Sequence, residues 1–554
     1  MQFSEAPILF PEDQPFWEAA RQGQLLLKWC NACGKPHFHP RPHCPLCGSR
    51  CTAWRAASGR GRIYSFTRTA RGAGKPLAPA VIELDEGVRV TSVVTDADLH
   101  ALAIDDEVVV SFGSGPAGEP VLAFTTPAAR QARAYSAQAL KASADVRGVP
   151  GDAAEAEIVE AAVIGGGRMG VGIAIALLTA GIRVQLVDAN GECLERARKT
   201  IADELSQMMA KGRLEAARPA ELLQALHTGT DMAAIANADL VVEAVWEQMG
   251  LKKEVFRQIN THAKPGAILG TNTSTLDVDQ IAGVTGRPDN VLGLHFFSPA
   301  HVMKLLEVVR GPRTGVQALL MARTLARRMR KVAVVVGICH GFVGNRLMIA
   351  REAEAARLLL DGATPQQVDR VLTEFGLPMG TFELQDMAGG IELSYRRRQE
   401  TGEKNWLIDR LFEAGRTGQR AGKGYYRYEP GKRAPIVDPE VTALIQQASR
   451  EAGITRRALP DQEVLERLVY PMINEGAKLM EEGIVERGSD IDVVWQHGFG
   501  WPAWKGGPMY YADQVGTAHV CGRLRELCKT HGDFFRPARL LEEFARTGMK
   551  LSAS

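Results

Sequence analysis

The chain has 554 residues, enough for about three or four domains, and 45% of them are hydrophobic, which is ample for buried cores. Lysine and arginine (66) nearly balance aspartate and glutamate (64), so the net charge gives no general argument for a nucleic-acid or anionic-membrane partner. No apolar run approaches the roughly 20 residues of a membrane helix, and the first residues lack the basic start and apolar core of a signal peptide. We therefore expect a soluble, cytoplasmic protein with no membrane partner.

Two C-x-x-C pairs stand near the start of the chain, with ten residues between them. A glycine follows each pair and suits the tight turn that a tetrahedral metal site requires. Four thiolates close the coordination shell of zinc, which is typical of a structural site. The predicted zinc ligands are Cys30, Cys33, Cys44 and Cys47. The histidines in the loop, His37, His39 and His43, are interpreted as solvated side chains rather than ligands.

Short valine-rich segments follow the cysteines, at residues 61–69, 79–96, 106–112 and 120–126. Their length and spacing predict a small β-barrel. A predicted helix and the zinc ribbon precede the barrel. This order resembles a zinc-ribbon/OB-fold family of acyl-CoA-associated proteins, whose barrel begins with G-x-G and carries a hairpin like Glu83–Arg89. The resemblance covers about residues 10–128. It implies acyl-CoA binding, or docking of a thiolase or another CoA enzyme.

Nucleic acid is the alternative partner for this region, since zinc ribbons and OB-folds also bind nucleic acids. The region has a local basic cluster, made of Arg60, Arg62, Arg68, Arg71 and Lys75. A solvated basic face, or one that meets CoA phosphates, explains this cluster as well as nucleic-acid binding does. Aromatic residues are few and spread apart here, whereas barrels that bind single strands stack bases on aromatic side chains. Nucleic acid is therefore the less favoured partner. Residues 129–157 are rich in Ala, Ser and Gly and are predicted to be a linker.

The stretch from Val163 to Asp188 reads as strand, glycine turn, helix, strand and acid. In a dinucleotide-binding turn, the first glycine makes the turn, the second admits the pyrophosphate, and the third allows close helix–strand packing. Asp188, 23 residues after the first glycine, is placed to accept hydrogen bonds from a ribose diol and to repel a 2′-phosphate. NAD is therefore favoured over NADP. The predicted turn consists of Gly165, Gly167, Arg168, Met169 and Gly170.

The α/β alternation continues beyond Asp188, and polar side chains stand at the ends of the later strands, where sites in open α/β sheets occur. His295 ends one predicted strand, and Glu307 lies in an apolar run, where an acid is costly unless it is paired. Histidine can take the hydroxyl proton of a secondary alcohol, and a carboxylate behind it fixes its tautomer. Ser274 and Asn345 are candidates for hydrogen bonds to the reacting oxygens.

Five motifs of this region together resemble the 3-hydroxyacyl-CoA dehydrogenase family, most closely the dehydrogenase half of multifunctional β-oxidation enzymes. The motifs are VIGGGRMG, VVEAVWE, TNTSTL, GLHFFSPAHVMKLLEVV and GFVGNR. The resemblance covers about residues 158–554. It implies NAD-dependent oxidation of an (S)-3-hydroxyacyl-CoA substrate to 3-oxoacyl-CoA. No hydratase signature is found in the N-terminal region, so no hydration activity is expected.

The resemblance also assigns roles by motif position. His295 matches the base and Glu307 its partner, while Ser274 and Asn345 match residues that contact substrate. Glu247 and Lys252 match positions that contact NAD and coenzyme A, although an exposed helix lysine explains Lys252 equally well. Ser298 stands where many members have asparagine, a change that touches a nicotinamide or ribose contact. Residues 419–426 resemble a loop closing near the cofactor, and a plain surface turn is the alternative.

The C-terminal half contains an internal repeat, in which residues 354–390 echo residues 475–516. A period above 100 residues indicates a duplicated domain rather than a solenoid. Each copy must bury an apolar face, and we expect the two copies to meet within one chain, which weakens the case for dimerisation through this face.

The predicted architecture is a multidomain chain with a zinc ribbon and OB-like barrel, a Rossmann-type α/β domain and a duplicated all-α domain. The expected boundaries are 1–128 for the zinc-ribbon/OB-fold domain, 129–157 for the linker, 158–338 for the NAD-binding domain, and 339–430 and 431–554 for the helical copies. The leading hypothesis is an NAD-dependent dehydrogenase with structural zinc. The alternative is a catalytically silent acyl-CoA-binding scaffold for a thiolase-type partner.

Overall fold

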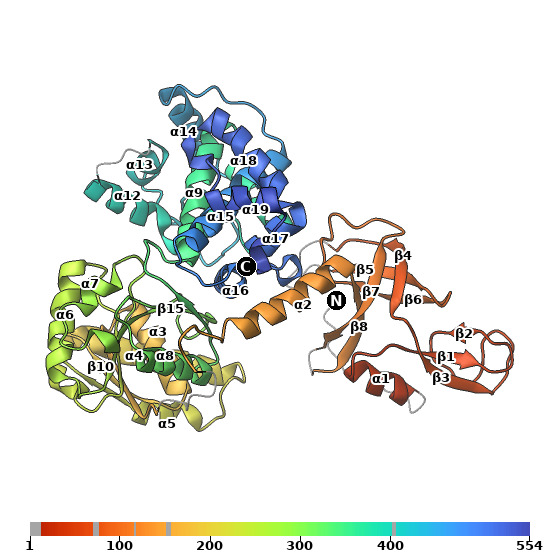
Figure 1. The fold of residues 1–554 in the computed structure, drawn as a ribbon, viewed down its shortest axis with the longest axis horizontal. Coiled ribbons are helices and arrows are strands. Elements are labelled where there is room, and N and C mark those ends of the chain that lie inside the picture. Colours follow the sequence, from red (N-terminus) through yellow and green to blue (C-terminus); the bar gives the residue numbers. More distant parts are fainter. Residues whose placement is uncertain (1–12, 70–76, 116–117, 151–156, 402–405, 554) are drawn as a thin grey trace. The chain divides into compact units, whose positions relative to one another are not determined.

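The computed structural model describes residues 13–69, 77–115, 118–150, 157–401 and 406–553, which Figure 1 draws as a ribbon. These residues form two compact units, one made mainly by the chain up to Tyr135 and the other by most of the remainder. Among the described residues, no helix has both the length and the apolar character needed to cross a membrane.

The first unit combines a small helix, a three-stranded sheet and a closed barrel, as the sequence predicts. Helix α1 (Gln14–Arg21) precedes an antiparallel sheet in the order β2-β1-β3, with β1 (Leu26–Cys30), β2 (Pro36–His37) and β3 (Thr52–Ala56). The barrel closes in the order β4-β5-β6-β8-β7, with β4 (Arg60–Phe66), β5 (Ala78–Leu84), β6 (Arg89–Val94), β7 (Glu107–Ser114) and β8 (Pro120–Thr125).

Alternation of buried and outward side chains builds the barrel core, since successive residues of a strand face opposite sides. In β5, Ala78, Ala80, Ile82 and Leu84 are buried and the residues between them are not. Gly61 belongs to the G-x-G motif, and a Cβ there would lie 2.5 Å from the Glu83 carbonyl oxygen. A glycine is therefore required where β4 and β5 approach most closely.

Helix α2 (Pro127–Ala142) occupies much of the segment predicted to be a linker. The lack of a sustained apolar pattern led to that prediction, but alanine is the best helix former, and small residues can build a buried stripe. Ala129, Ala132, Ser136, Ala139 and Ser143 recur at helical spacing and are all buried. A periodicity of small side chains was the missed signal.

The second unit contains an eight-stranded sheet in the order β11-β10-β9-β12-β13-β14-β15-β16. Its strands are β9 (Glu160–Ile164), β10 (Arg183–Val187), β11 (Leu226–Gly229), β12 (Leu240–Glu243), β13 (Ile268–Thr271), β14 (Val291–Phe296), β15 (Leu305–Val309) and β16 (Val332–Val336). The helices between them are α3 (Arg168–Thr179), α4 (Gly191–Ala210), α5 (Arg218–Gln224), α6 (Met249–His262), α7 (Val278–Ala282) and α8 (Val316–Arg328). Helices lie on both faces of this sheet (Figure 1).

The sheet is parallel except at one step, where β14 and β15 run antiparallel. Every residue of β12, β13, β14 and β15 is buried, as expected for strands covered on both faces. The antiparallel register pairs His295 directly with Glu307. Opposed residues in such a pair point to the same face, so the two side chains meet by construction.

The remainder of the second unit is helical and contains the predicted duplication. Its helices are α9 (Gly344–Asp361), α10 (Pro365–Phe375), α11 (Thr381–Ala388), α12 (Gly390–Thr401), α13 (Trp406–Glu413), α14 (Pro439–Glu451), α15 (Asp461–Glu481), α16 (Gly488–Gly498), α17 (Pro508–Val515), α18 (Thr517–His531) and α19 (Arg539–Thr547). Helix α9, the first long helix of one copy, packs against α15, its counterpart in the other.

The two copies repeat the same capping device in detail. The Asp369 carboxylate accepts hydrogen bonds from two amides at the start of α11, at 2.9 and 3.0 Å, and the Asp492 carboxylate does so at the start of α17, at 2.7 and 3.0 Å. A Cβ on Gly380 or on Gly507 would lie within 2.4 Å of the respective carboxylate. The shared aspartate–glycine contact shows that both halves fold alike.

Candidate active site

The glycine turn has the geometry that a bound dinucleotide requires. Gly165 has a φ of +110°, and a Cβ there would lie 2.7 Å from the Ala244 carbonyl oxygen. A Cβ on Gly170 would lie 1.8 Å from the Gly165 carbonyl oxygen, because α3 packs tightly on the turn. Apart from its chain neighbours, no atom of the described residues lies within 4 Å of a Cβ on Gly167, so this glycine faces open space at the start of α3. That space and the free amides of the helix N-terminus suit a pyrophosphate.

Asp188 follows the end of β10 and lies beside the same turn. Its Oδ2 accepts a hydrogen bond from the Gly166 amide at 2.7 Å, and its Oδ1 accepts one from the Asn190 amide at 2.9 Å. The carboxylate is half-buried, so its remaining lone pairs can accept hydrogen bonds from a diol. These residues therefore fit the expected NAD.

His295 and Glu307 form a buried hydrogen-bonded pair. The His295 Nδ1 atom lies 2.7 Å from Glu307 Oε2, and the Glu307 side chain is fully buried. A carboxylate can only accept in this contact, so Nδ1 carries the hydrogen and Nε2 keeps a free lone pair. A histidine held in this tautomer can take a proton at Nε2.

The other oxygen of Glu307 reaches the start of the helical region. Its Oε1 accepts hydrogen bonds from the Val343 and Gly344 amides, at 3.2 and 2.9 Å. Val343 is the N-cap of α9 and makes no side-chain cap of its own. Glu307 therefore caps this helix from the neighbouring sheet, and the helix dipole favours the negative charge there. Sequence reasoning missed this role, because a cap supplied from another element leaves no local motif.

Glu247 gathers the loop that follows β13. Its Oε1 accepts hydrogen bonds from the Thr273 hydroxyl at 2.7 Å, the Ser274 amide at 2.8 Å and the Ser274 hydroxyl at 3.1 Å. Burial raises the pKa of Glu247, but the hydrogen bond from Thr273 and the charge of Lys252 outweigh it and lower this pKa overall. Two predicted site residues, Ser274 and Glu247, are thus in direct contact.

Lys252 is neither the exposed helix lysine nor a group open to a phosphate. Its side chain is fully buried, and its Nζ lies 2.7 Å from Glu243 Oε1 and 3.5 Å from Glu247 Oε2. Glu243 also accepts a hydrogen bond from the Thr271 hydroxyl at 2.6 Å. Sequence reasoning missed Glu243, although an acid within an apolar run was the same signal that identified Glu307.

The other predicted residues lie around this centre. Asn345 is half-buried at the second position of α9, and Ser298 is exposed just after β14. The ring of Phe342, whose φ is +48°, lies 5.6 Å from the ring of His295. Residues 419–426 make their contacts with the first helical copy instead: the Tyr425 and Tyr426 amides donate to Asp386 at 2.8 and 2.9 Å.

The four cysteines of the first unit form a compact cluster, with all Sγ atoms within 4.8 Å of one another. Gly34 and Gly48 have φ values of +69° and +73°, as the tight turns require. The cluster therefore fits one tetrahedral zinc ion. His37 is buried, and neither of its ring nitrogens has a hydrogen-bond partner among the described residues, so its interpretation as a solvated side chain was wrong.

Two of the three described arginines in the basic cluster of the barrel pair with acids. Arg60 pairs with Asp85 at 3.2 Å, Arg62 pairs with Glu107 at 2.7 Å, and Arg68 donates to two backbone carbonyls. Arg71 and Lys75 lie outside the described residues. Arg60 and Arg62 therefore have acidic partners with which a phosphate backbone would have to compete, which counts against the nucleic-acid alternative to that extent.

Comparison with known families agrees with this geometry. The NAD-binding domain model of 3-hydroxyacyl-CoA dehydrogenase matches residues 160–339, and the C-terminal domain model matches residues 341–428 and 464–552. The dehydrogenase part of multifunctional enzyme 1 from C. elegans is 31% identical, with a TM-score of 0.57, and the match covers 74% of this chain and 96% of that one. The chain belongs to the 3-hydroxyacyl-CoA dehydrogenase family. The second match of the C-terminal model confirms the duplication.

Other relatives carry the same dehydrogenase region. A 3-hydroxybutyryl-CoA dehydrogenase from Escherichia coli is 27% identical with a TM-score of 0.61, over 71% of this chain and 99% of that one. A peroxisomal bifunctional enzyme of Danio rerio is 40% identical over 66% of this chain and 53% of its own length. A peroxisomal β-oxidation multifunctional protein of Arabidopsis thaliana is 37% identical over 72% and 56%. The chain thus spans about half the length of these two curated relatives.

The first unit matches two further family models, and both confirm the predicted modules. Residues 17–52 match the rubredoxin-like zinc ribbon domain of ChsH2, and residues 54–113 match its C-terminal OB-fold domain. The zinc-ribbon match agrees with the four-cysteine cluster and supports structural zinc.

Substitution of two glycines should separate cofactor binding from folding. Gly167→Ala places its methyl group in the space reserved for the pyrophosphate, so we expect at least about a tenfold weaker NAD affinity with a melting temperature near that of the unmodified protein. Gly170→Ala clashes with backbone and should cost about 3 kcal/mol or more of stability. Calorimetric titration with NAD and thermal unfolding measure both effects. Equal NAD affinity in Gly167→Ala would contradict the cofactor placement.

Zinc analysis of freshly purified protein should give about one ion per chain, since four thiolates form one closed shell. Cys44→Ser should lose the metal and lower the melting temperature of the first unit, because ligand loss removes folding free energy. Cys51→Ser is the matched control, since Cys51 is exposed and lies outside the cluster. A metal-free unmodified protein would remove the zinc site.

Proposed function

We propose that the chain is an active NAD-dependent (S)-3-hydroxyacyl-CoA dehydrogenase, which oxidises its substrate to 3-oxoacyl-CoA. The observation that carries the proposal is the buried His295–Glu307 pair, 2.7 Å apart, in a unit that also contains a dinucleotide-type glycine turn. Family membership makes this reaction the natural one, and the names of the relatives agree with it.

The proposed mechanism divides the reaction between proton and hydride. Bound NAD would supply the acceptor for the hydride that leaves the carbinol carbon. His295 Nε2 takes the hydroxyl proton, and the electron pair of the O–H bond forms the carbonyl π bond. Glu307 holds the ring in the required tautomer and stabilises the imidazolium that results. Asn345 and Ser274 hydrogen-bond the substrate oxygens and hold the carbinol in place. To donate to the substrate, the Ser274 hydroxyl turns away from Glu247, to which it donates in this structure.

The remaining predicted residues serve cofactor binding in this proposal. The glycine turn, with Arg168 and Met169, holds the pyrophosphate, and Asp188 accepts hydrogen bonds from the adenosine ribose. Glu247 and Ser298 lie at the nicotinamide end. Lys252, which is buried against two glutamates, acts indirectly by fixing Glu247 rather than by binding a phosphate.

The first unit is proposed to dock a CoA-using partner, such as a thiolase, or to hold acyl-CoA. This proposal rests on the zinc-ribbon and OB-fold matches. The cytoplasmic location expected from the sequence also stays a proposal, and the curated relatives described above are peroxisomal by name.

The central experiment measures NADH formation at 340 nm with a panel of (S)-3-hydroxyacyl-CoA substrates, from short linear to bulky cyclic acyl groups. Turnover with at least one of them is expected, and the same panel with NADP should be much slower because Asp188 repels a 2′-phosphate. Silence across the panel together with no NAD binding would favour the alternative, a catalytically silent acyl-CoA scaffold.

The His295–Glu307 pair can be tested separately. His295→Ala should lower kcat by about 10²- to 10⁴-fold, because it removes the general base. Glu307→Gln should lower kcat at least about tenfold, since an amide cannot stabilise the imidazolium in the same way. His227→Ala, at an exposed histidine of β11, is the control and should leave kcat unchanged. Activity within a few-fold of the unmodified enzyme in His295→Ala would refute the base assignment.

A further inference from the structure

Two reciprocal sets of ion pairs join α9 to α15. From α9, the Arg346 guanidinium contacts Glu475 at 2.9 Å and Glu482 at 2.5 and 2.7 Å. From α15, the Arg467 guanidinium contacts Glu354 at 2.5 Å and Asp361 at 2.6 Å. With Glu482, the C-cap residue of α15, included, each helix thus supplies one arginine and two acids to the other.

The two sets are counterparts in the duplication. Arg346, Glu354 and Asp361 stand 121 positions before Arg467, Glu475 and Glu482, respectively. The acids that hold Arg346 are therefore the equivalents of those that hold Arg467. Because the two arginines have equivalent acidic partners, a difference in their roles must come from what else each arginine adjoins.

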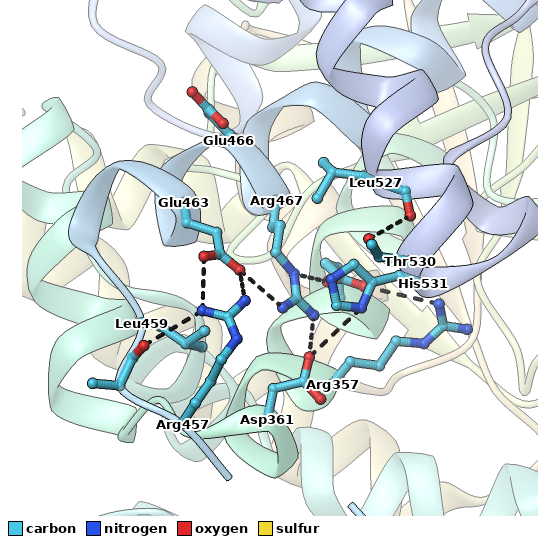
Figure 2. A network of polar contacts seen from close by, with 12 residues as sticks. Arg357, Asp361, Arg457, Leu459, Glu463, Glu466, Arg467, Leu527, Thr530 and His531 are labelled. Atoms are coloured by element: carbon cyan, nitrogen blue, oxygen red, sulfur yellow. Dashed lines mark hydrogen bonds and ion pairs between the residues drawn. The ribbon is translucent and has the colours of Figure 1, made fainter. Parts of the chain in front are cut away.

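The surroundings of the two arginines differ. Arg346 comes directly after Asn345 in the first turn of α9, the turn whose Val343 and Gly344 amides bond to Glu307. Arg467 lies in the interior of α15. Figure 2 shows its guanidinium among Asp361, Glu463 and the ring of His531, and none of these belongs to the proposed active site.

The Arg346 contacts are suited to hold a helix end in place. Three hydrogen bonds to two carboxylates fix the guanidinium in one orientation, and charge-assisted contacts of this kind are the stronger hydrogen bonds. The Arg346 and Glu475 side chains are each only 19% exposed, so water screens this contact weakly. The hydrogen bonds that Arg346 donates to Glu482 raise the pKa of Arg346, so its charge is permanent.

We infer that Arg346 is a positioning residue for the proposed reaction, through which the second helical copy holds the first turn of α9 against Glu307. Glu475 and Glu482 hold the Arg346 guanidinium. The helix turn that contains Arg346 donates to Glu307, and Glu307 in turn orients His295. The inference rests on the proposed function for the roles of His295 and Glu307. It gives the second copy a part in catalysis although that copy supplies none of the proposed catalytic residues.

The test compares Arg346→Met with its counterpart Arg467→Met. For Arg346→Met we expect about a 10- to 100-fold lower kcat, the scale expected when a reacting group is misplaced by about 1 Å, and a KM for NAD within about twofold. Arg467→Met should lose at least as much thermal stability, because Arg467 and Glu354 are both fully buried, yet keep kcat within about twofold. Both variants are assayed at a temperature where they are fully folded.

Hydrogen–deuterium exchange supplies a readout that needs no substrate. Loosening of the α9 N-terminus should speed exchange of the Val343 and Gly344 amides at least about tenfold in Arg346→Met and leave it unchanged in Arg467→Met. If the unmodified protein turned over no substrate, the proposed function would fail, and this exchange comparison would still decide whether Arg346 positions the turn.

Two results overturn the inference: an equal loss of kcat in both arginine variants, or unchanged exchange at Val343 and Gly344 in Arg346→Met. If Arg346→Met does not fold, the milder Glu482→Gln replaces it, with the counterpart Asp361→Asn as the control. The same contrast in kcat and in exchange is then expected at smaller size, and its absence overturns the inference.

Discussion

The antiparallel pairing of β14 with β15 is the constraint on which the proposed site depends. It places His295 opposite Glu307 in a sheet that is otherwise parallel. Because side chains alternate faces along a strand, a register slip of one residue would move Glu307 to the other face of the sheet. Both strands are buried along their whole length, so the core fixes their faces and, with them, the geometry of the pair.

Burial makes Glu307 expensive, and its partners explain why the chain tolerates it. An unpaired carboxylate in the interior costs several kcal/mol. The His295 ring and two amides of α9 offset this cost, since hydrogen bonds to charged groups contribute about 1.5–3 kcal/mol each. The same carboxylate is therefore the orienting acid of the proposed base and the cap of the first helix of the helical region. One side chain, Glu307, thus serves both the proposed catalysis and the packing of the helical region against the sheet.

Much of this could be predicted from the sequence. The glycine turn, the cysteine cluster, the barrel and the duplication were all predicted, because each depends on local spacing or on a repeated pattern. His295 and Glu307 were identified because a polar residue in an apolar run is informative. The paired state of Lys252 and the cap on α9 could not be predicted, since both depend on which strands become neighbours. His37 and α2 were misinterpreted because small or isolated side chains give a weak burial signal.

The duplication explains how a site built from one copy can still depend on two. The copies share the same capping aspartates and the same reciprocal arginine contacts, yet only the first copy begins beside the sheet. The first turn of α9 therefore contacts Glu307. Among its described contacts, the start of α15 has no comparable acid from the sheet. The two copies pack on each other symmetrically, but the residues beside their helix ends differ. The second copy therefore keeps its structural contact with the first copy, while the start of α15 takes no part in the site. In the inferred arrangement, Glu475 and Glu482 of this copy act on the proposed reaction through Arg346.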